Sequence, residues 1–89
     1  MFAEWDEEKA QSNPKKHGVS FEEAATVFEG PVAVTFEDHE HSRNEERLVT
    51  IGYSTQLRVL LVVNADREDK IRIISARKAT ATERKLYEQ

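Results

Sequence analysis

The 89-residue sequence contains no cysteine, only three glycines and two prolines, and few aromatic residues. Without cysteine, the chain can form no disulfide, no thiolate metal site and no cysteine nucleophile. This absence fits the reducing cytoplasm, where we expect the protein to be located. The longest apolar run, Val59–Val63, is far too short to cross a membrane. The acidic start, "MFAEWDEEK", lacks the apolar centre of a signal peptide.

The composition predicts one small globular domain over residues 1–89. Hydrophobic residues make up 38% of the chain and charged residues 34%, which is typical of a soluble domain with a thin core. The net charge of −4 argues against a general nucleic-acid binder. However, residues 1–46 hold four Lys/Arg against twelve Asp/Glu, and residues 47–89 hold nine against five. The second half could present a cationic face to phosphates, although an uneven solvated surface explains the same distribution.

Two helices are predicted in the first third of the chain, after a possible short strand, "FAEW". Asp6 can cap a first helix that begins at Glu7. Pro14 lacks an N–H and clashes with the preceding turn. We therefore expect a kink near Asn13, or a first helix divided into two short pieces.

The stretch "KKHGVSFEEA", residues 15–24, has two explanations. In the first, Gly18 ends one helix in a left-handed conformation, and the cations before it complement the helix dipole. Ser20 and Glu23 then form the capping box of the next helix. In the second, Lys16 and His17 belong to a functional site. The pattern by itself favours capping, and the second explanation stays open.

The remaining elements follow from apolar spacing. A second helix is predicted from Phe21 to about Glu29, then a strand over 32–36 and an exposed loop over 37–46. Three further strands, "RLVTIGYS", "LRVLLVV" and "KIRIISA", are joined by the polar connections "TQ" and "NADRED". Thr80 or Thr82 opens a last helix, "TERKLYEQ".

This order predicts an α+β fold. It has two N-terminal helices, a four-stranded, mainly antiparallel sheet with a possible short extra N-terminal strand, and a C-terminal helix. The helices are expected on one face of the sheet, which leaves the other face partly open.

Arginines concentrate on the predicted strands. In "KIRIISARK", regular alternation places Arg72 and Arg77 on opposite sides of the strand, and "EER", residues 45–47, opens an adjacent strand. One explanation is an ion pair between Glu45 or Glu46 and one of these arginines. The other is a phosphate site, in which each guanidinium binds phosphate through two hydrogen bonds and a histidine or carboxylate moves a proton. That set suits attack by an RNA 2′-hydroxyl on its neighbouring phosphate.

Two further features are weighed in the same way. The segment "DHEH", residues 38–41, could ligate a metal, but a polar loop without helix-spaced ligands favours a solvated segment. Trp5 and Tyr87 could stack on bases. For Trp5, a position covering the core is favoured.

Three separated segments resemble one protein family. "EWDEEKAQSNPKKHGVSFEEAATVF", "EERLVTIG" and "IRIISARKATATERKLYE" together are similar to the BrnT family of bacterial toxins, in the RelE-like ribonuclease group. The resemblance covers nearly the whole chain in the same order. Its most specific pieces are Lys16-His17-Gly18, Glu46-Arg47, Ile73-Ile74-Ser75-Ala76-Arg77 and Glu83-Arg84.

The resemblance implies a RelE-like α+β fold with an open, RNA-facing sheet surface. It implies ribosome-independent, metal-free endoribonuclease activity, with no cofactor, that arrests growth. It also implies a BrnA-type ribbon–helix–helix antitoxin that neutralises the toxin in a complex of two toxins and two antitoxins. Contact with operator DNA comes through the antitoxin.

The resemblance also suggests which residues act. Arg47, Arg72 and Arg77 are the expected phosphate contacts, with Glu46 or His17 as general base and Lys16 and Lys78 as further RNA contacts.

Two residues depart from the usual family pattern: Pro14 within the first helix, and Asn64, where relatives often carry an aromatic residue or histidine. Asn64 would weaken catalysis if it faces RNA. Two other functions stay open: a non-catalytic module that only binds the antitoxin as a co-repressor, and a plain RNA-binding domain.

Overall fold

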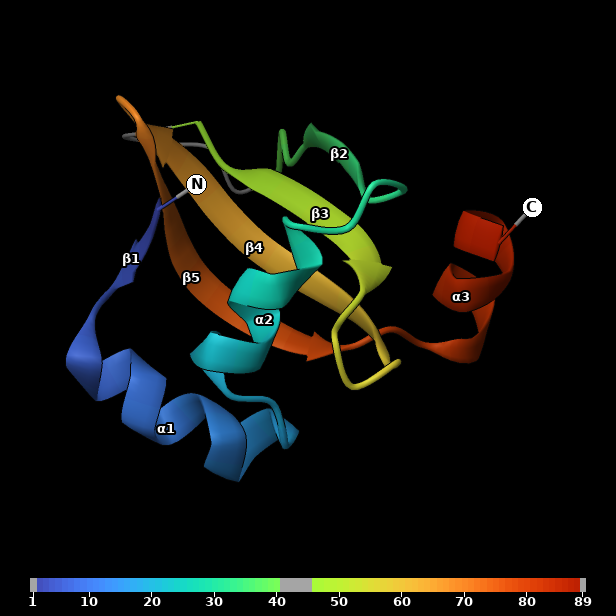
Figure 1. Cartoon of the computed structure of the whole chain (residues 1–89), viewed down its shortest axis with the longest axis horizontal. Coiled ribbons are helices and arrows are strands. Elements are labelled where there is room, and N and C mark those ends of the chain that lie inside the picture. Colours follow the sequence, from blue (N-terminus) through green and yellow to red (C-terminus); the bar gives the residue numbers. More distant parts are fainter. Residues whose placement is uncertain (1, 41–45, 89) are drawn as a thin grey trace.

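The computed structural model describes residues 2–40 and 46–88 (Figure 1). Its elements, in chain order, are β1 (Phe2–Trp5), α1 (Glu7–His17), α2 (Phe21–Val27), β2 (Val34–Glu37), β3 (Leu48–Tyr53), β4 (Val59–Arg67), β5 (Lys70–Lys78) and α3 (Ala81–Glu88). The predicted α+β order is confirmed. None of the helices in these residues combines the length and the apolar content that a bilayer crossing needs.

The strands form one sheet in the order β1-β5-β4-β3-β2. Strands β2 to β5 pair with antiparallel neighbours, as predicted. The short N-terminal strand is also confirmed, and it lies parallel to β5, from Phe2 opposite Lys70 to Trp5 opposite Ile73. The sheet is therefore mixed and has five strands.

Several strand boundaries differ from the prediction, and two of them change how a segment is described. The polar stretch "NADRED" is not a connection, because β4 continues through Arg67 and only Glu68 and Asp69 separate it from β5. Polar residues are tolerated at this end of the hairpin because Asp66 and Arg67 are exposed to solvent. Strand β2 begins at Val34 rather than at residue 32, because the turn after α2 extends that far.

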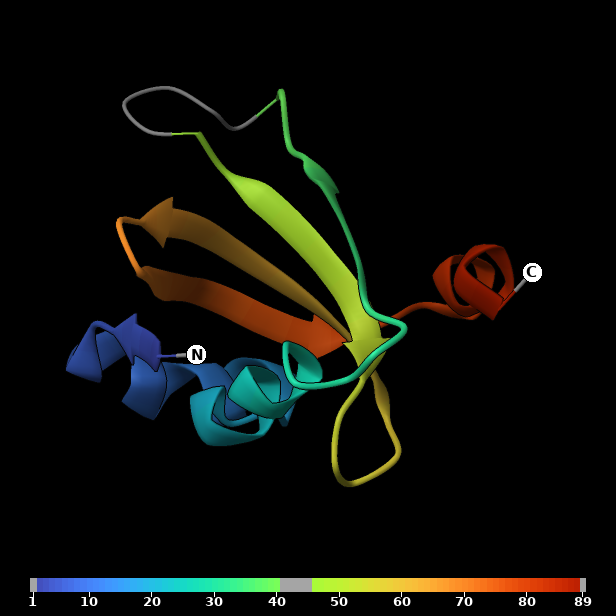
Figure 2. The same ribbon diagram turned by 45° about the horizontal axis from the view of Figure 1, so that its top comes forward.

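Helices α1 and α2 cover one face of the sheet, and α3 lies on the other side (Figure 2). The core beneath α1 and α2 contains Val19, Phe21, Ala24, Val27, Leu60, Val62, Ile73 and Ala76. A second cluster, Val49, Ile51, Val59 and Leu61, packs against Tyr87 of α3. The prediction that all helices share one face is therefore wrong for α3. The reason is that β3 and β4 carry apolar residues on both faces, so both faces have apolar surface to bury.

Helix α1 is continuous through Pro14, so the predicted division into two short pieces is wrong. The Asn13 side chain is buried and donates to the carbonyl oxygens of Val19 and Ala76, at 2.8 Å each. It also accepts from the N–H of Ala76 at 3.3 Å. These bonds fix the end of α1 onto β5. Gly18 follows with a left-handed φ of 71° and donates to the Pro14 carbonyl oxygen, as the capping explanation requires.

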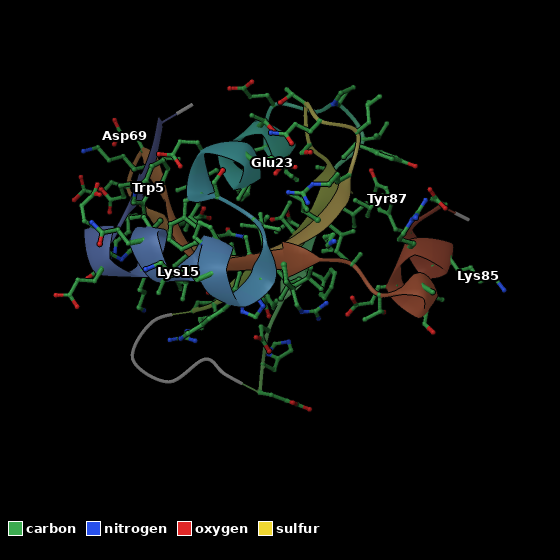
Figure 3. The ribbon with its side chains drawn as sticks, turned by 90° about the horizontal axis from the view of Figure 1, so that it is seen from below. Trp5, Lys15, Glu23, Asp69, Lys85 and Tyr87 are labelled. Carbon is green, nitrogen blue, oxygen red and sulfur yellow. The ribbon has the colours of Figure 1, made fainter. Side chains whose placement is uncertain are left out.

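Both predicted N-caps are confirmed, but the capping box of α2 is incomplete. Asp6 accepts from two N–H groups of α1, and Ser20 accepts from the N–H of Glu23 at 3.0 Å. The Glu23 carboxylate points instead to Arg58 and Ser54, with Arg58 Nε 3.0 Å and Ser54 Oγ 2.6 Å from Oε2. The Arg58 guanidinium holds the pKa of buried Glu23 below its ordinary value. This pair ties α2, where Figure 3 labels Glu23, to the β3–β4 turn, which carries Arg58.

Candidate active site

The face of the sheet opposite α1 and α2 carries a groove of about 800 Å³, bounded by β2 on one side and α3 on the other. Its floor is apolar and consists of Val49, Ile51, Leu61 and Val63. Val34, Phe36 and Leu86 line it as exposed apolar side chains. Its polar lining residues are Asp38, Arg47, Ser75, Arg77, Glu83 and Tyr87. We call this feature the groove.

Arg77 is the best-fixed cation of the groove. Its Nη1 and Nη2 atoms donate to Oε1 and Oε2 of Glu83 at 2.8 and 2.9 Å, which is a bidentate pair. Nη1 also donates to the carbonyl oxygen of Lys78 at 3.2 Å. The Arg77 guanidinium lowers the pKa of Glu83 to about 2, and Glu83 in turn raises the pKa of Arg77. Both groups therefore stay charged at neutral pH.

Glu83 is placed by the start of α3. Its N–H donates to the Thr80 hydroxyl at 3.1 Å, and its Oε1 accepts from the N–H of Thr80 at 2.8 Å. Of the two predicted caps, Thr80 is therefore the one used, in a reciprocal capping box. Because the same carboxylate closes the box and binds Arg77, the helix start and the groove arginine form one unit.

The other end of α3 is anchored by tyrosines. The Tyr87 hydroxyl donates to the Val32 carbonyl oxygen at 2.8 Å, and its ring meets Tyr53 edge-on with centroids 6.0 Å apart. Tyr53 donates to Glu88, a bond that raises the pKa of the phenol. Figure 3 shows Tyr87 on the side of α3 toward the strands and Lys85 pointing away.

Arg72 shares the face of the sheet with Arg77 but lies outside the groove lining. A β-bulge in the β4–β5 pairing changes the alternation between them. Arg72 Nη1 is 3.6 Å from a carboxylate oxygen of Glu4 on β1. The predicted ion pairs of Glu46 with these arginines are therefore wrong, because Arg72 pairs with Glu4 and Arg77 with Glu83. Glu45 lies outside the described residues.

Arg47 lines the groove at the start of β3. Its carbonyl oxygen accepts from the N–H of Asp38 at 2.8 Å, which brings these two groove residues together at one end of the sheet. Arg47 is thus the second sequence-predicted arginine that the fold brings to the groove.

The remaining predicted site residues lie elsewhere. Glu46 is exposed, and a hydrogen bond with Glu37 raises its pKa, but it does not line the groove. Lys16 and His17 end α1, on the opposite side of the sheet (Figure 2). Lys78 is exposed and pairs with Leu60, whose side chain belongs to the core beneath α1 and α2. The structure therefore does not bring these four residues into the groove.

The "DHEH" segment divides between two environments. Asp38 lines the groove, whereas exposed His39 places Nε2 3.0 Å from Oε2 of Glu37. Within residues 2–40 and 46–88, no three His, Asp or Glu side chains gather closely enough to hold a metal ion. His41 lies outside the described residues.

Asn64 and Trp5 are both structural. Asn64 is 2% exposed, and its Nδ2 donates to Thr50 Oγ1 at 3.1 Å and to the Val62 carbonyl oxygen at 3.0 Å. It does not line the groove. Trp5 packs against the core and meets Phe21 edge-on at 5.9 Å, which confirms its predicted position.

Comparison with known proteins identifies the family. Residues 5–83 match the family described as "Ribonuclease toxin, BrnT, of type II toxin-antitoxin system". The chain belongs to the BrnT family. It is also similar to the crystal structure of the Brucella abortus ribonuclease toxin BrnT, with 26% identity and a TM-score of 0.68. That match covers 90% of this chain and 99% of the other. No curated protein sequence matches.

BrnT membership confirms the resemblance drawn from the three sequence segments. The protein is a ribonuclease toxin of a type II toxin–antitoxin system, and it therefore has a cognate antitoxin. The similarity to the Brucella BrnT structure also confirms the predicted fold.

Two charged groove residues of this BrnT chain, Asp38 and Glu83, are not among the predicted site residues. Glu83 belongs to a motif that carries the resemblance, but the sequence does not show that it pairs with Arg77. Asp38 was weighed only as a metal ligand. The sequence signal for Asp38 is its position directly after β2. Because β2 and β3 are antiparallel, the end of β2 lies beside the start of β3, and this brings Asp38 next to Arg47.

Proposed function

We propose that the chain is a metal-independent endoribonuclease that binds RNA in the groove. The observation that carries this proposal is Arg77, a half-buried arginine fixed in a groove that also contains Arg47. A guanidinium stays charged and stabilises the negative charge that develops on a phosphate during transfer. The apolar floor supports the same proposal, because it gives bases a dry surface beside the charges.

The proposed reaction is attack by the RNA 2′-oxygen on the adjacent phosphorus. The P–O bond to the 5′-oxygen of the next nucleotide breaks, which leaves a 2′,3′-cyclic phosphate and a 5′-hydroxyl. A general base takes the 2′-hydroxyl proton, and the 5′-oxygen receives one. Arg47 and Arg77 stabilise the charge on the phosphate.

The general base in this proposal is Asp38. Glu46 and His17, the bases suggested by the sequence, lie outside the groove. Glu83 lines the groove, but its pKa of about 2 makes it a poor base. Arg72, Lys16 and Lys78 do not line the groove, so this proposal gives them no contact with the reacting phosphate.

The antitoxin in this proposal is a BrnA-like ribbon–helix–helix protein in a 2:2 complex, which contacts operator DNA itself. The exposed side chains of Val34, Phe36 and Leu86 support an apolar contact at the groove. Such a contact excludes RNA and so neutralises the toxin.

The test is cleavage of a defined RNA by the purified chain, with and without EDTA. We expect cleavage to persist in EDTA and the products to end in 2′,3′-cyclic phosphate. Induced expression should arrest growth, and co-expression of the antitoxin should restore it. Loss of cleavage in EDTA with recovery on adding a divalent ion would overturn the metal-free mechanism. Normal growth at verified soluble expression would favour the non-catalytic alternative.

A further inference from the structure

The Arg77 guanidinium has five N–H donors, and its known contacts use three of them. Two, one each on Nη1 and Nη2, go to the Glu83 carboxylate. The second N–H of Nη1 goes to the carbonyl oxygen of Lys78. The two N–H groups that point away from the side chain, one on each Nη atom, are therefore both bonded to Glu83. Together with the bond to Lys78, they fix the plane of the guanidinium at three points.

The two remaining N–H groups, on Nε and on the outer side of Nη2, are parallel in a planar guanidinium. They form the second fork of the arginine, with the same spacing as the first. In the part of the chain that the structure describes, no acceptor is bonded to either of them. Because Arg77 lines the groove, this fork is the part of the guanidinium left for a ligand bound there.

We propose that Glu83 is a positioning residue, which holds Arg77 so that its Nε/Nη2 fork binds the phosphate undergoing cleavage. The inference rests on the proposed ribonuclease function. Glu83 does not contact RNA in this arrangement. It removes the rotational freedom of the guanidinium before RNA arrives, so that the catalytic contact is preorganised.

The surroundings of Glu83 favour positioning over competition with RNA. A carboxylate that only neutralised Arg77 until phosphate displaced it would need to move away. Glu83 is instead tied to Thr80 by the capping box, in both directions, and its side chain is only 28% exposed. Displacement would break the helix start as well as the ion pair, whereas the second fork of Arg77 can be used with both intact.

The decisive variant is Glu83→Gln. The glutamine oxygen can accept from Thr80 and from Arg77 Nη1, so the helix start is kept. The amide nitrogen cannot accept from Nη2, so the second point of the bidentate pair is lost. We expect kcat for a defined RNA to fall roughly 10- to 100-fold, as for other small misplacements of a catalytic group. KM should change little. The melting temperature should fall, because half of the bidentate pair with Arg77 is lost, but the variant should stay folded at the assay temperature.

The matched control is Glu22→Gln, which removes one exposed carboxylate from α2, on the other face of the sheet and outside the groove lining. Its kcat should equal that of the parent chain. If Glu83→Gln instead raises kcat or tightens RNA binding, Glu83 competes with phosphate, and the proposal is wrong. Unchanged kcat with a lowered melting temperature would make Glu83 purely structural, which also overturns it.

The Arg77→Ala variant separates failure of this inference from failure of the proposed function. If the parent chain cleaves RNA, Arg77→Ala does not, and Glu83→Gln cleaves normally, only the positioning role is wrong. If the parent chain does not cleave RNA, or Arg77→Ala cleaves as well as the parent, the proposed use of the groove is wrong.

Discussion

Arg72 and Arg77 lie on the same face of the sheet, although they are five positions apart on one strand. Regular alternation would place them on opposite faces. Pairing shifts at Val63 and Asn64, where Ser75 and Ile73 are the partners, so Ile74 is an extra residue in β5. Because of the bulge, both arginines point to the face of the sheet that carries the groove, whereas in a regular strand only one of them could.

The two arginines should nevertheless differ in importance. Arg77→Ala is expected to lower the RNA cleavage rate roughly 30- to 1,000-fold, since a charge-assisted contact to the transition state is worth about 2–4 kcal/mol. Arg72→Ala should lower it less than about tenfold, because Arg72 is paired with Glu4 outside the groove lining. Arg67→Ala, at the exposed end of β4, controls for the lost charge. If all three variants cleave RNA at the same rate, the groove is not the site of RNA cleavage.

The general base can be identified from three substitutions. Asp38→Asn should reduce cleavage at neutral pH by roughly 100- to 10,000-fold, because the proton of the 2′-hydroxyl loses its acceptor. His17→Ala and Glu46→Gln should cleave at close to the parent rate, because neither residue lines the groove. If His17→Ala cleaves RNA much more slowly than the parent chain and Asp38→Asn cleaves at the parent rate, the general base is His17 and not Asp38.

The Glu23–Arg58 pair should matter for stability, with unequal effects from its two sides. Arg58→Met leaves a carboxylate that is only 3% exposed without its cation, which is expected to cost about 3–5 kcal/mol of unfolding free energy. Glu23→Gln leaves an arginine side chain that is 32% exposed and can be hydrated, so its cost should be smaller. Urea denaturation of both variants at pH 7 gives the comparison. If Glu23→Gln lowers the unfolding free energy more than Arg58→Met does, the burial of the unpaired partner does not determine the cost of breaking the pair.

The stabilising effect of Glu83 should depend on pH in a defined window. Its pKa is lowered from 4.5 to about 2, so the unfolded chain binds the proton more tightly than the folded chain. The contribution is therefore complete above pH 4.5 and decreases as the pH falls toward 2. We expect any stability gap between the parent chain and Glu83→Gln to be constant near neutrality and to close over that acidic range. Thermal melts at intervals from pH 7 to pH 2.5 measure it.

Much of the fold could be predicted because local signals and apolar periodicity agree. Asp6, Gly18, Ser20 and Thr80 end or begin helices as their side-chain chemistry predicts. The error at Pro14 has a tertiary cause: the side chain of the preceding Asn13 holds the helix onto a strand 63 residues away in sequence. No local pattern contains that contact.

The candidate site could be predicted only in part. Arginines on strands are visible in the sequence, and Arg47 and Arg77 do line the groove. The partners of charged residues are not visible, because each depends on register: Glu4 reaches Arg72 through the parallel pairing of β1 with β5. The bulge at Ile74 is equally hidden, since the segment "KIRIISARK" reads as a regular alternating strand.

Helix α3 forms one wall of the groove but has no buried residue of its own. It is held by the Arg77–Glu83 pair, by the hydrogen bonds from Tyr87 to Val32 and from Tyr53 to Glu88, and by the packing of Tyr87, whereas α1 and α2 are embedded in the core. A segment held by so few contacts opens locally at a much lower free energy than the whole domain. Amide protons of α3 should therefore exchange with solvent long before those of β4. On warming, cleavage is expected to stop while the sheet is still intact, so the temperature limit of the toxin reports the detachment of one short helix.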